Sequence, residues 1–369
     1  MAKPLIKANQ NIKNHHTFSS SIPIIIINWN GLQDTLECIA SVQKLFFPHF
    51  KIYLVDNHSS DESASILKAC FESDASITLI FNQENLGFTR ANNEVFKLIL
   101  QEEELPPYIA LLNNDTIVDP NWLTSLVKTA QQKEADIVSS KMIDYYERTK
   151  MDNAGHLMLN TGEILPIGHG ADIEQYNNIF ENMGACAGAC LYSTSMLQEI
   201  GIFDEYFTTG YEDAELGARA SIAGYKCIFE PAAIVYHKMG QSIKKVFNYQ
   251  YAVDIQKKVL YTLLKLTPTS TLFFNLPFIL LRYTVIILMQ LVFWRPRYLE
   301  IIIQSIKGVL IDDYTKVKTA RQSNSAHRKL SFLAINKKQT FFLCNNLKRF
   351  YHYFIQKKQS AFDAYGKKK

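Results

Sequence analysis

The sequence is short of glycine and has no glycine-rich nucleotide loop. Only 15 of its 369 residues are glycine, and the Gly-x-Gly-x-x-Gly pattern is absent. The loop after the third apolar run contains a single glycine, Gly87. Because close approach of the backbone to a dinucleotide pyrophosphate requires several glycines, this absence counts against a nicotinamide-dependent oxidoreductase.

The cysteines form no metal-binding pattern, and the first residues form no secretion signal. Six cysteines are spread along the chain without paired zinc spacing, and Cys186 and Cys190 have no second pair. We therefore expect buried free thiols. Residues 1–21 are polar and lack an apolar core of signal-peptide length, so we expect the chain to stay in the cytosol.

Acidic residues are almost absent from the end of the chain. From Tyr314 onward there are 14 Lys or Arg and one acid, Asp363, a net charge of +13, whereas residues 1–313 carry −9. Such a tail favours a polyanion. Because aromatic residues are interleaved with the bases and an apolar segment precedes them, we predict an anionic membrane surface and no nucleic acid as partner. A solvated tail without a partner is the alternative.

The sequence does contain a regular alternation of apolar runs and amphipathic segments. Short β-branched runs separated by helical patterns predict an α/β fold with a doubly wound, mostly parallel sheet. The expected strands are residues 22–27, 51–55, 77–81, 109–112, 135–139 and 227–236.

Compact polar side chains stand where several of these strands end. Asn28 follows the first strand and Asp56 the second, while Asn113, Asn114 and Asp115 follow the fourth. The carboxyl ends of parallel strands share one edge of the sheet, where ligands bind. Asp115 suits a hard divalent cation that holds a diphosphate, and Asp56 suits a ribose or a base edge. A polar strand-to-helix turn without a ligand is the alternative for Asp115.

A predicted helix after Gly87 presents further polar groups. Arg90, Asn92 and Asn93 lie near its start, where the helix dipole and the free backbone amides favour phosphate. Residues 184–192 are rich in small side chains, and we expect them to serve packing rather than chemistry.

An acidic cluster and a histidine lie in the later part of the α/β pattern. Glu212, Asp213 and Glu215 crowd the first turn of a predicted helix, where the helix dipole favours negative charge. A carboxylate held there could also act as a general base toward a sugar hydroxyl. His237 closes the last strand, and a core residue, a phosphate donor and a metal ligand all stay open for it.

These features occur in one order, which resembles a known family. The order is Asn28, Val55-Asp56-Asn57-His58-Ser59-Ser60-Asp61, Asn85-Leu86-Gly87-Phe88, Leu112-Asn113-Asn114-Asp115, Phe203-Asp204-Glu205, Glu212-Asp213-Ala214-Glu215 and His237. Over residues 22–240 the pattern is similar to the family 2 glycosyltransferases with a GT-A fold, most closely the bacterial rhamnosyltransferase-like branch. The resemblance implies transfer of a sugar, with inversion, from a nucleotide-diphosphate donor such as dTDP-rhamnose. It also implies Mg²⁺ or Mn²⁺ as cofactor.

The resemblance also implies roles for residues of this chain. The predicted donor site comprises Asn28, Asp56, Asn57, Asn85, Gly87, Asn93 and Asn114. Asp115 and His237 are the predicted metal residues. Asp213 is the predicted catalytic base, with Glu212 beside it. In residues 113–115 only the last residue is acidic, which departs from the family's metal motif. The implied acceptor is a glycan or a lipid-linked glycan in cell-envelope polysaccharide synthesis, such as that of lipopolysaccharide.

The C-terminal third carries the predicted membrane contact. Residues 247–266 form an amphipathic pattern with Lys257, Lys258 and Lys265 expected to point outward. Residues 272–294 are apolar but interrupted, and we expect an interfacial helix that lets Arg282 reach lipid headgroups. A membrane span and a buried packing helix are the alternatives. The expected location is the cytoplasmic face of the inner (plasma) membrane, peripheral or monotopic.

The chain is thus expected to have four parts, with its oligomeric state open. They are a disordered tail (residues 1–20), a GT-A catalytic domain (21–265), an apolar helical membrane-associating segment (266–313) and a basic tail (314–369). A nucleotidyltransferase is one alternative function, although its glycine-rich basic loop is absent after Ile27. A catalytically inactive, membrane-associated sugar-binding module is another.

Overall fold

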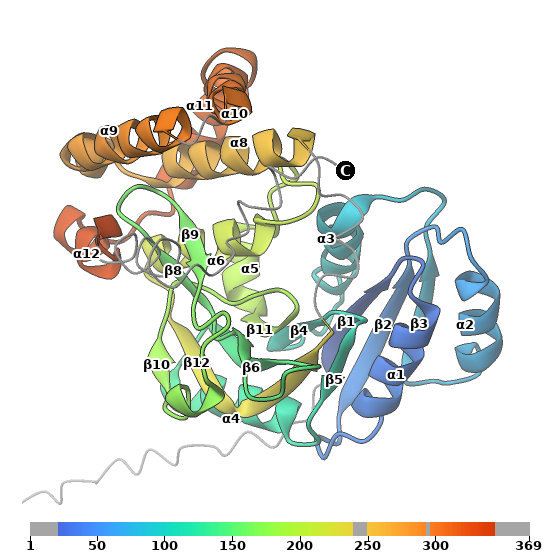
Figure 1. The fold of residues 1–369 in the computed structure, drawn as a ribbon. Helices are drawn as coiled ribbons and strands as arrows, with labels where there is room; N and C mark the ends of the chain where they lie inside the picture. Colours follow the sequence, from blue (N-terminus) through green and yellow to red (C-terminus); the bar gives the residue numbers. More distant parts are fainter. Residues whose placement is uncertain (1–20, 239–248, 293–295, 344–369) are drawn as a thin grey trace, which may run out of the picture.

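The computed structural model describes residues 21–238, 249–292 and 296–343. The tail of residues 1–20, expected to be disordered, and residues 344–369 of the basic tail lie outside the described residues. The described chain forms an α/β body with a layer of C-terminal helices on one side of it (Figure 1).

One large mixed sheet organises the body. Its strand order is β10-β12-β6-β11-β4-β1-β2-β3, and β5 and β7 are attached to β12 and β6. The neighbours β4, β1, β2 and β3 are parallel, as are β6 and β12. The bounds are β1 Ile22–Asn28, β2 Phe50–Asp56, β3 Ile77–Phe81, β4 Tyr108–Leu112, β5 Thr116–Val118, β6 Ile137–Asp144, β7 Met151–Asn153, β10 Phe180–Glu181, β11 Ala189–Ser193 and β12 Cys227–His237.

The mostly parallel, doubly wound sheet predicted from the sequence is confirmed, with one strand added. β11 runs antiparallel between β4 and β6, and it belongs to the segment that we expected to serve packing. The strand expected at residues 135–139 is β6, which runs from Ile137 to Asp144. A short separate hairpin, β8 (His156–Met158) with β9 (Ile164–Pro166), packs against the helix of residues 212–223.

Helices cover both faces of the sheet because its central strands are apolar on both sides. In β1, Ile24 and Ile26 face one core with α1 and α4, whereas Ile25 faces a second core with α3, α5 and α6. Buried parallel strands are apolar throughout for this reason. The bounds are α1 Leu32–Val42, α2 Ser63–Phe71, α3 Gly87–Ile99, α4 Trp122–Lys133, α5 Thr194–Ile200 and α6 Glu212–Ala223, with a short 3₁₀ turn at Ile173–Gln175.

The C-terminal helices pack on the body beside α6 and the β8–β9 hairpin (Figure 1). They are α8 Tyr249–Leu266, α9 Thr269–Val292, α10 Pro296–Lys307, a π-helical turn at Gly308–Asp312, α11 Tyr314–Ser325 and α12 Phe332–Lys338. Over Thr269–Leu288, α9 is long and apolar enough to cross a membrane.

Two predictions about these helices are wrong. Lys258 and Lys265 of α8 are buried, not outward, and Lys265 Nζ lies 2.6 Å from Asp204 Oδ2 and 2.8 Å from Glu215 Oε1. Arg282 of α9 does not reach outward either, because its Nε lies 2.8 Å from Glu163 Oε2 in the body. The amphipathic pattern could not show these acids, which come from distant parts of the chain.

Candidate active site

The ends of β1, β2 and β4 bring three predicted donor-site residues together. Asn28 Nδ2 donates to Asp56 Oδ1 at 2.7 Å, and Asn114 Nδ2 lies 3.4 Å from Asn28 Oδ1. Thr35 joins them, since its hydroxyl donates to Asn28 Oδ1 at 2.8 Å and accepts from Asn114 Nδ2 at 2.9 Å. Ser59 donates to Asp56 Oδ1 at 2.6 Å. The cluster forms because parallel pairing sets Asn28 and Asp56 side by side at the same edge.

A second set of predicted residues lies at the ends of β2 and β3. Asn57 Nδ2 donates to Asn85 Oδ1 at 2.9 Å, and Asn85 Oδ1 also accepts from Gly87 N at 2.9 Å. Gly87 has φ +71°, and a Cβ there would come within 2.9 Å of the Thr208 carbonyl oxygen. Only glycine combines this conformation with so close an approach. Gly87 therefore lets the loop before α6 lie against the start of α3.

Asn93 is not brought to either set. It lies about 1.7 helical turns beyond Gly87, and its Nδ2 donates to the carbonyl oxygen of Phe203 at 3.0 Å. Its Oδ1 is buried and has no hydrogen-bond partner among the described residues. Its observed contact joins α3 to the loop that leads toward α6.

Asp115 and His237, the predicted metal residues, lie in direct contact. His237 Nε2 is 3.2 Å from Asp115 Oδ1, and His237 Nδ1 is 2.7 Å from Asp152 Oδ2. Burial lowers the pKa of His237, but hydrogen bonds to the two carboxylates outweigh it and raise this pKa to about 10. Burial likewise raises the pKa of Asp152, but hydrogen bonds to His169 and His237 bring it down to about 2. The two carboxylates therefore favour the protonated imidazole, and a metal ion bound at Nε2 would take the place of the proton on that nitrogen.

The donor set at Asp115 fits a divalent cation that takes its other ligands from substrate. A carboxylate oxygen and an imidazole nitrogen 3.2 Å apart can both contact one ion, and Asp152 on the far ring nitrogen matches the carboxylate–histidine–metal arrangement. Within the described residues, no group of three or more His, Cys, Asp or Glu side chains is placed to hold a metal. Diphosphate oxygens and water would have to complete the coordination.

Asp213 and Glu212 begin α6 in different environments. Asp213 is partly buried, and its Oδ2 accepts from Ala187 N at 2.9 Å. Glu212 is buried, and its Oε2 has no hydrogen-bond partner among the described residues. Burial, with the neighbouring charge of Asp213, raises the pKa of Glu212 to about 8, so this carboxyl group is neutral at pH 7. Glu215, the third acid of the cluster, is fully buried and paired with Arg219 and Lys265.

One turn joins the base region to the metal region. At residues 186–188, Ala187 N donates to Asp213, and the carbonyl oxygen of Gly188 accepts from Asn113 N at 2.9 Å. Asp115 follows Asn113 by two residues. The turn therefore contacts Asp213 directly and the segment that leads to Asp115 through the backbone of Asn113.

Several residues of the site were missed by sequence reasoning. Asp152, Thr35, Ser59 and the backbone amide of Ala187 all contact predicted site residues. Thr35 and Ser59 lie close in sequence to strand ends, which is a usable signal. Asp152 and Ala187 come from β7 and from the turn before β11, and no local pattern marks them.

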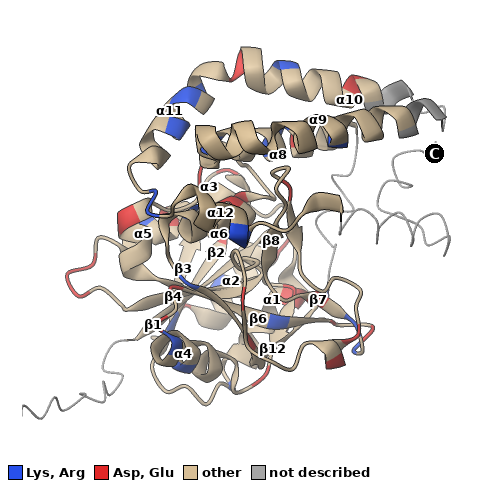
Figure 2. Ribbon diagram, turned by 90° about the vertical axis from the view of Figure 1, so that its left-hand side faces the viewer, with Lys and Arg blue, Asp and Glu red and all other residues tan. Residues whose placement is uncertain are grey.

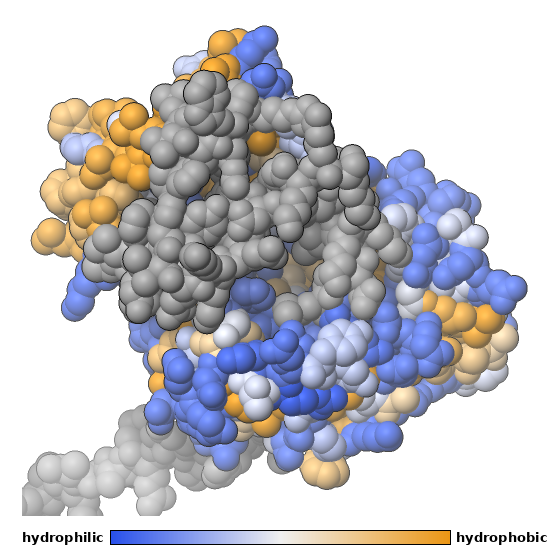
Figure 3. Space-filling view, viewed as in Figure 1, coloured by the Kyte–Doolittle hydropathy of each residue, from blue (hydrophilic) through white to orange (hydrophobic). Residues whose placement is uncertain are grey.

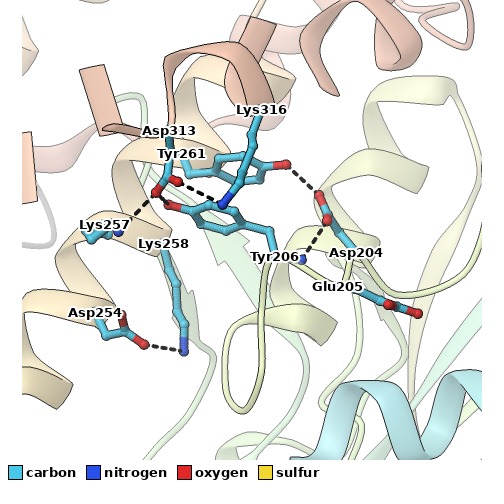
Figure 4. A pocket seen from close by; sticks show the side chains of 9 residues that line it. All are labelled: Asp204, Glu205, Tyr206, Asp254, Lys257, Lys258, Tyr261, Asp313 and Lys316. Carbon is cyan, nitrogen blue, oxygen red and sulfur yellow. Dashed lines mark hydrogen bonds and ion pairs between the residues drawn. The ribbon is translucent and has the colours of Figure 1, made fainter. Parts of the chain in front are cut away.

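A separate cavity has a volume of about 430 Å³ (Figure 4). It lies between residues 204–206, which precede α6, and the helices α8 and α11. Tyr206 and Tyr261 stack in it with ring centroids 3.7 Å apart, and Asp313 binds Lys257 and Lys316, both at 3.0 Å. Apart from Glu205, which pairs with Lys97 of α3, the charged groups of this cavity have partners among its lining residues, so the cavity marks the joint between the body and the C-terminal helices.

Comparisons with known proteins agree on one family. Residues 24–201 match the family model Glycosyl transferase family 2. Glycosyltransferase GlyG of Streptococcus pneumoniae is 23% identical over 242 residues, 64% of this chain and 77% of that protein. O-antigen biosynthesis protein RfbC of Myxococcus xanthus is 26% identical over 214 residues, 55% of this chain but only 16% of that protein.

A solved structure is similar to the fold. GalNAc-T7, with UDP, GalNAc and Mn²⁺, has a TM-score of 0.52 and 14% identity, covering 66% of this chain and 47% of that one. Likeness at this level of identity bears on the fold alone. It agrees with the mixed, mostly parallel sheet described above.

Proposed function

We propose that this family 2 glycosyltransferase, which matches the family model over residues 24–201, transfers a sugar from a nucleotide-diphosphate donor. The acceptor is a hydroxyl group of a glycan or lipid-linked glycan. The single observation that carries the proposal is the shared turn at residues 186–188. It contacts Asp213 on one side and Asn113, two residues before Asp115, on the other. This contact supports a base and a diphosphate-holding centre on either side of one turn, an arrangement that suits sugar transfer.

The donor binds along the edge formed by the ends of β1 to β4. Asn28, Asp56 and Asn114 form the wall of the nucleotide pocket, with Asn57 and Asn85 shaping the loop beside it. Asp115 and His237 would hold the cation. When bound there, Mg²⁺ or Mn²⁺ supplies neutralisation of the charge on the departing diphosphate.

Asp213 acts as the general base in a single displacement. Its carboxylate takes the proton of the acceptor hydroxyl while the oxygen attacks the anomeric carbon, the bond from that carbon to the diphosphate breaks, and the configuration inverts. The hydrogen bond from Ala187 N at 2.9 Å fixes the direction of the carboxylate. Glu212 is neutral at pH 7 and does not compete as base, so its role is to shape the surroundings of Asp213.

The finer assignment is L-rhamnose from dTDP-rhamnose, used in cell-envelope polysaccharide synthesis at the cytoplasmic face of the plasma membrane. Its support is the branch resemblance of the motifs and the distant likeness to an O-antigen biosynthesis protein. A panel of nucleotide sugars with dTDP-rhamnose among them tests the donor. Preference for another donor would reject rhamnose and leave the transferase standing.

The catalytic assignment is tested by Asp213→Asn. We expect release of nucleoside diphosphate to fall by at least a hundredfold, because a missing general base costs about two to four orders of magnitude. Donor affinity, measured by calorimetry, should change less than threefold. Asp312→Asn, at an exposed acid remote from the strand edge, is the matched control and should keep full activity.

The same assay separates the other functions. A nucleotidyltransferase would release pyrophosphate from a nucleoside triphosphate, and an inactive sugar-binding module would bind a donor without releasing any product. Wild-type turnover in Asp213→Asn would remove the base assignment.

A further inference from the structure

One side of α9 is apolar and exposed to solvent. Phe273 is 78% exposed and Leu280 is 58% exposed, values far above those of buried core side chains. Further exposed apolar residues on the same side are Phe274, Leu276, Val285 and Leu288. At 100° per residue these positions cover about half of the helix circumference. Figure 3 shows the resulting hydrophobic patch at the upper left of the molecule, where α9 lies.

The opposite side of α9 is fixed to the rest of the protein. Asn275 and Arg282 are 1% and 4% exposed, and between them Ile279 is buried. Arg282 binds Glu163, next to the β8–β9 hairpin, and Asn275 donates to Gln339 at 3.2 Å. These two contacts are seven residues apart, about 10 Å along the helix axis. Protein therefore covers this side over about two turns.

The exposed apolar side and the buried side of α9 together limit how this helix can bind a bilayer. A spanning helix must be surrounded by lipid or by other spanning segments through the hydrocarbon core. The inner side of α9 instead holds an ion pair with the α/β body, which cannot enter that core. A helix with one apolar side free and one side seated on a folded domain can only lie along the membrane surface.

The apolar surface continues beyond α9 and has bases next to it. The Phe274 and Phe332 rings are 5.5 Å apart, which joins α9 to α12, where Leu333 is 75% exposed and Lys337 and Lys338 occupy the last turn. The sequence of residues 344–369 adds seven Lys or Arg and one acid. Figure 2 shows the contrast between the nearly uncharged α9 and the basic residues of α11.

We propose that α9 lies in the plane of an anionic phospholipid bilayer, with Phe273, Leu280 and their neighbours inserted below the headgroups and the bases of α12 on the headgroups. Apolar insertion and attraction of bases to anionic lipid are the two signals that together give stable peripheral binding. A second copy of this chain is the rival occupant of the patch, but the excess of bases in the tail complements lipid phosphate rather than an identical surface.

The orientation has a consequence for the acceptor. Lys258 of α8, in the same helical layer, donates to the carbonyl oxygen of Thr209 at 2.8 Å, four residues before Asp213. The membrane-bound layer therefore lies next to the base, within reach of a lipid-linked acceptor. This part rests on the proposed function, whereas the membrane contact does not and is measured without substrate.

Vesicle binding of the full chain tests the contact. Purified protein is sedimented with vesicles of phosphatidylcholine alone or mixed with phosphatidylglycerol, and we expect binding only to the mixed vesicles. The double variant Phe273→Ser, Leu280→Ser should lose at least tenfold in affinity with an unchanged melting temperature. The matched control is Phe46→Ser, Leu98→Ser, which removes apolar residues that are 70% and 51% exposed on the α/β body and should bind like wild type.

Three outcomes would overturn the proposal. The first is that the wild-type protein does not bind mixed vesicles. The second is that the α9 double variant binds them as tightly as wild type. The third is that the wild-type protein binds no vesicles but forms a dimer in solution, which the double variant does not form. Since none of these readouts involves sugar transfer, the transferase assignment can fail or stand separately.

Discussion

Glu212 has a strongly raised pKa in the folded protein. In the folded protein its pKa is about 8, above its ordinary value of 4.5, because burial disfavours the charged carboxylate. Since the folded state holds the proton more tightly than the unfolded state, the stability of the protein falls as pH rises from about 4.5 through about 8.

Glu212→Gln keeps the neutral form at every pH. We expect it to be more stable than wild type by a margin that is small near pH 5 and grows to a few kcal/mol near pH 8, since one pKa unit corresponds to about 1.4 kcal/mol. Thermal unfolding across this range measures the margin. Glu104→Gln, at an exposed acid, should show no such trend. A margin independent of pH would contradict the burial of an ionisable Glu212.

Asp152 is expected to set the orientation of His237. Asp152→Asn weakens the hydrogen bond on Nδ1, and loss of such a partner typically costs 10- to 100-fold in metal affinity. Calorimetric titration of Mn²⁺ in the presence of nucleoside diphosphate measures this effect. His169→Gln, which changes a more exposed contact of Asp152, should have a smaller effect. Equal effects of the two substitutions would contradict the orienting role.

At the residue scale, the sequence predicts the parts of the site that follow from strand ends. Asn28, Asp56 and Asn114 could be grouped because parallel strands end at one edge. Asp152 could not, because its place depends on the pairing of β7 with β6. The Ala187 amide could not either, since its contact with Asp213 depends on the insertion of β11 between two other strands.

The element that connects the two parts of the molecule is α8. Lys265 is buried between Asp204 and Glu215, and Lys265→Met leaves both carboxylates without this partner. We expect a loss of about 3 kcal/mol in the free energy of unfolding, as is usual when one member of a buried ion pair is removed. Chemical denaturation measures it.

Lys257→Met provides the comparison on the same helix. Lys257 binds Asp313 at 3.0 Å, but its side chain is 24% exposed, and Lys316 still binds Asp313 after the substitution. We therefore expect the smaller loss here, about 1 kcal/mol or less. A loss as large as that of Lys265→Met would mean that burial does not distinguish the two lysines.

At the element scale, the alternating strands and helices of the body were predictable because their periodicity is local. The direction of the lysines in α8 was not. An amphipathic pattern assigns charged positions to solvent, and the acids that reverse this assignment for Lys265 lie 50 to 61 residues away, at Glu215 and Asp204.

At the scale of the whole molecule, the described body and helices should unfold together. Lys265 with Asp204 and Arg282 with Glu163 bind the C-terminal layer to the body through buried ion pairs. We expect one calorimetric transition whose calorimetric and van't Hoff enthalpies agree, because neither part can lose its partner without leaving buried charge uncompensated. Two separated transitions would show that the layer is an independent unit.

The ion pair between Glu163 and Arg282 also bears on biosynthesis. The two residues are 119 positions apart, so the ribosome synthesises Glu163 long before the apolar helix α9 that carries Arg282. We therefore expect Arg282 to find Glu163 already in place, and the pairing of the two to favour packing of α9 on the body over insertion of α9 across a membrane.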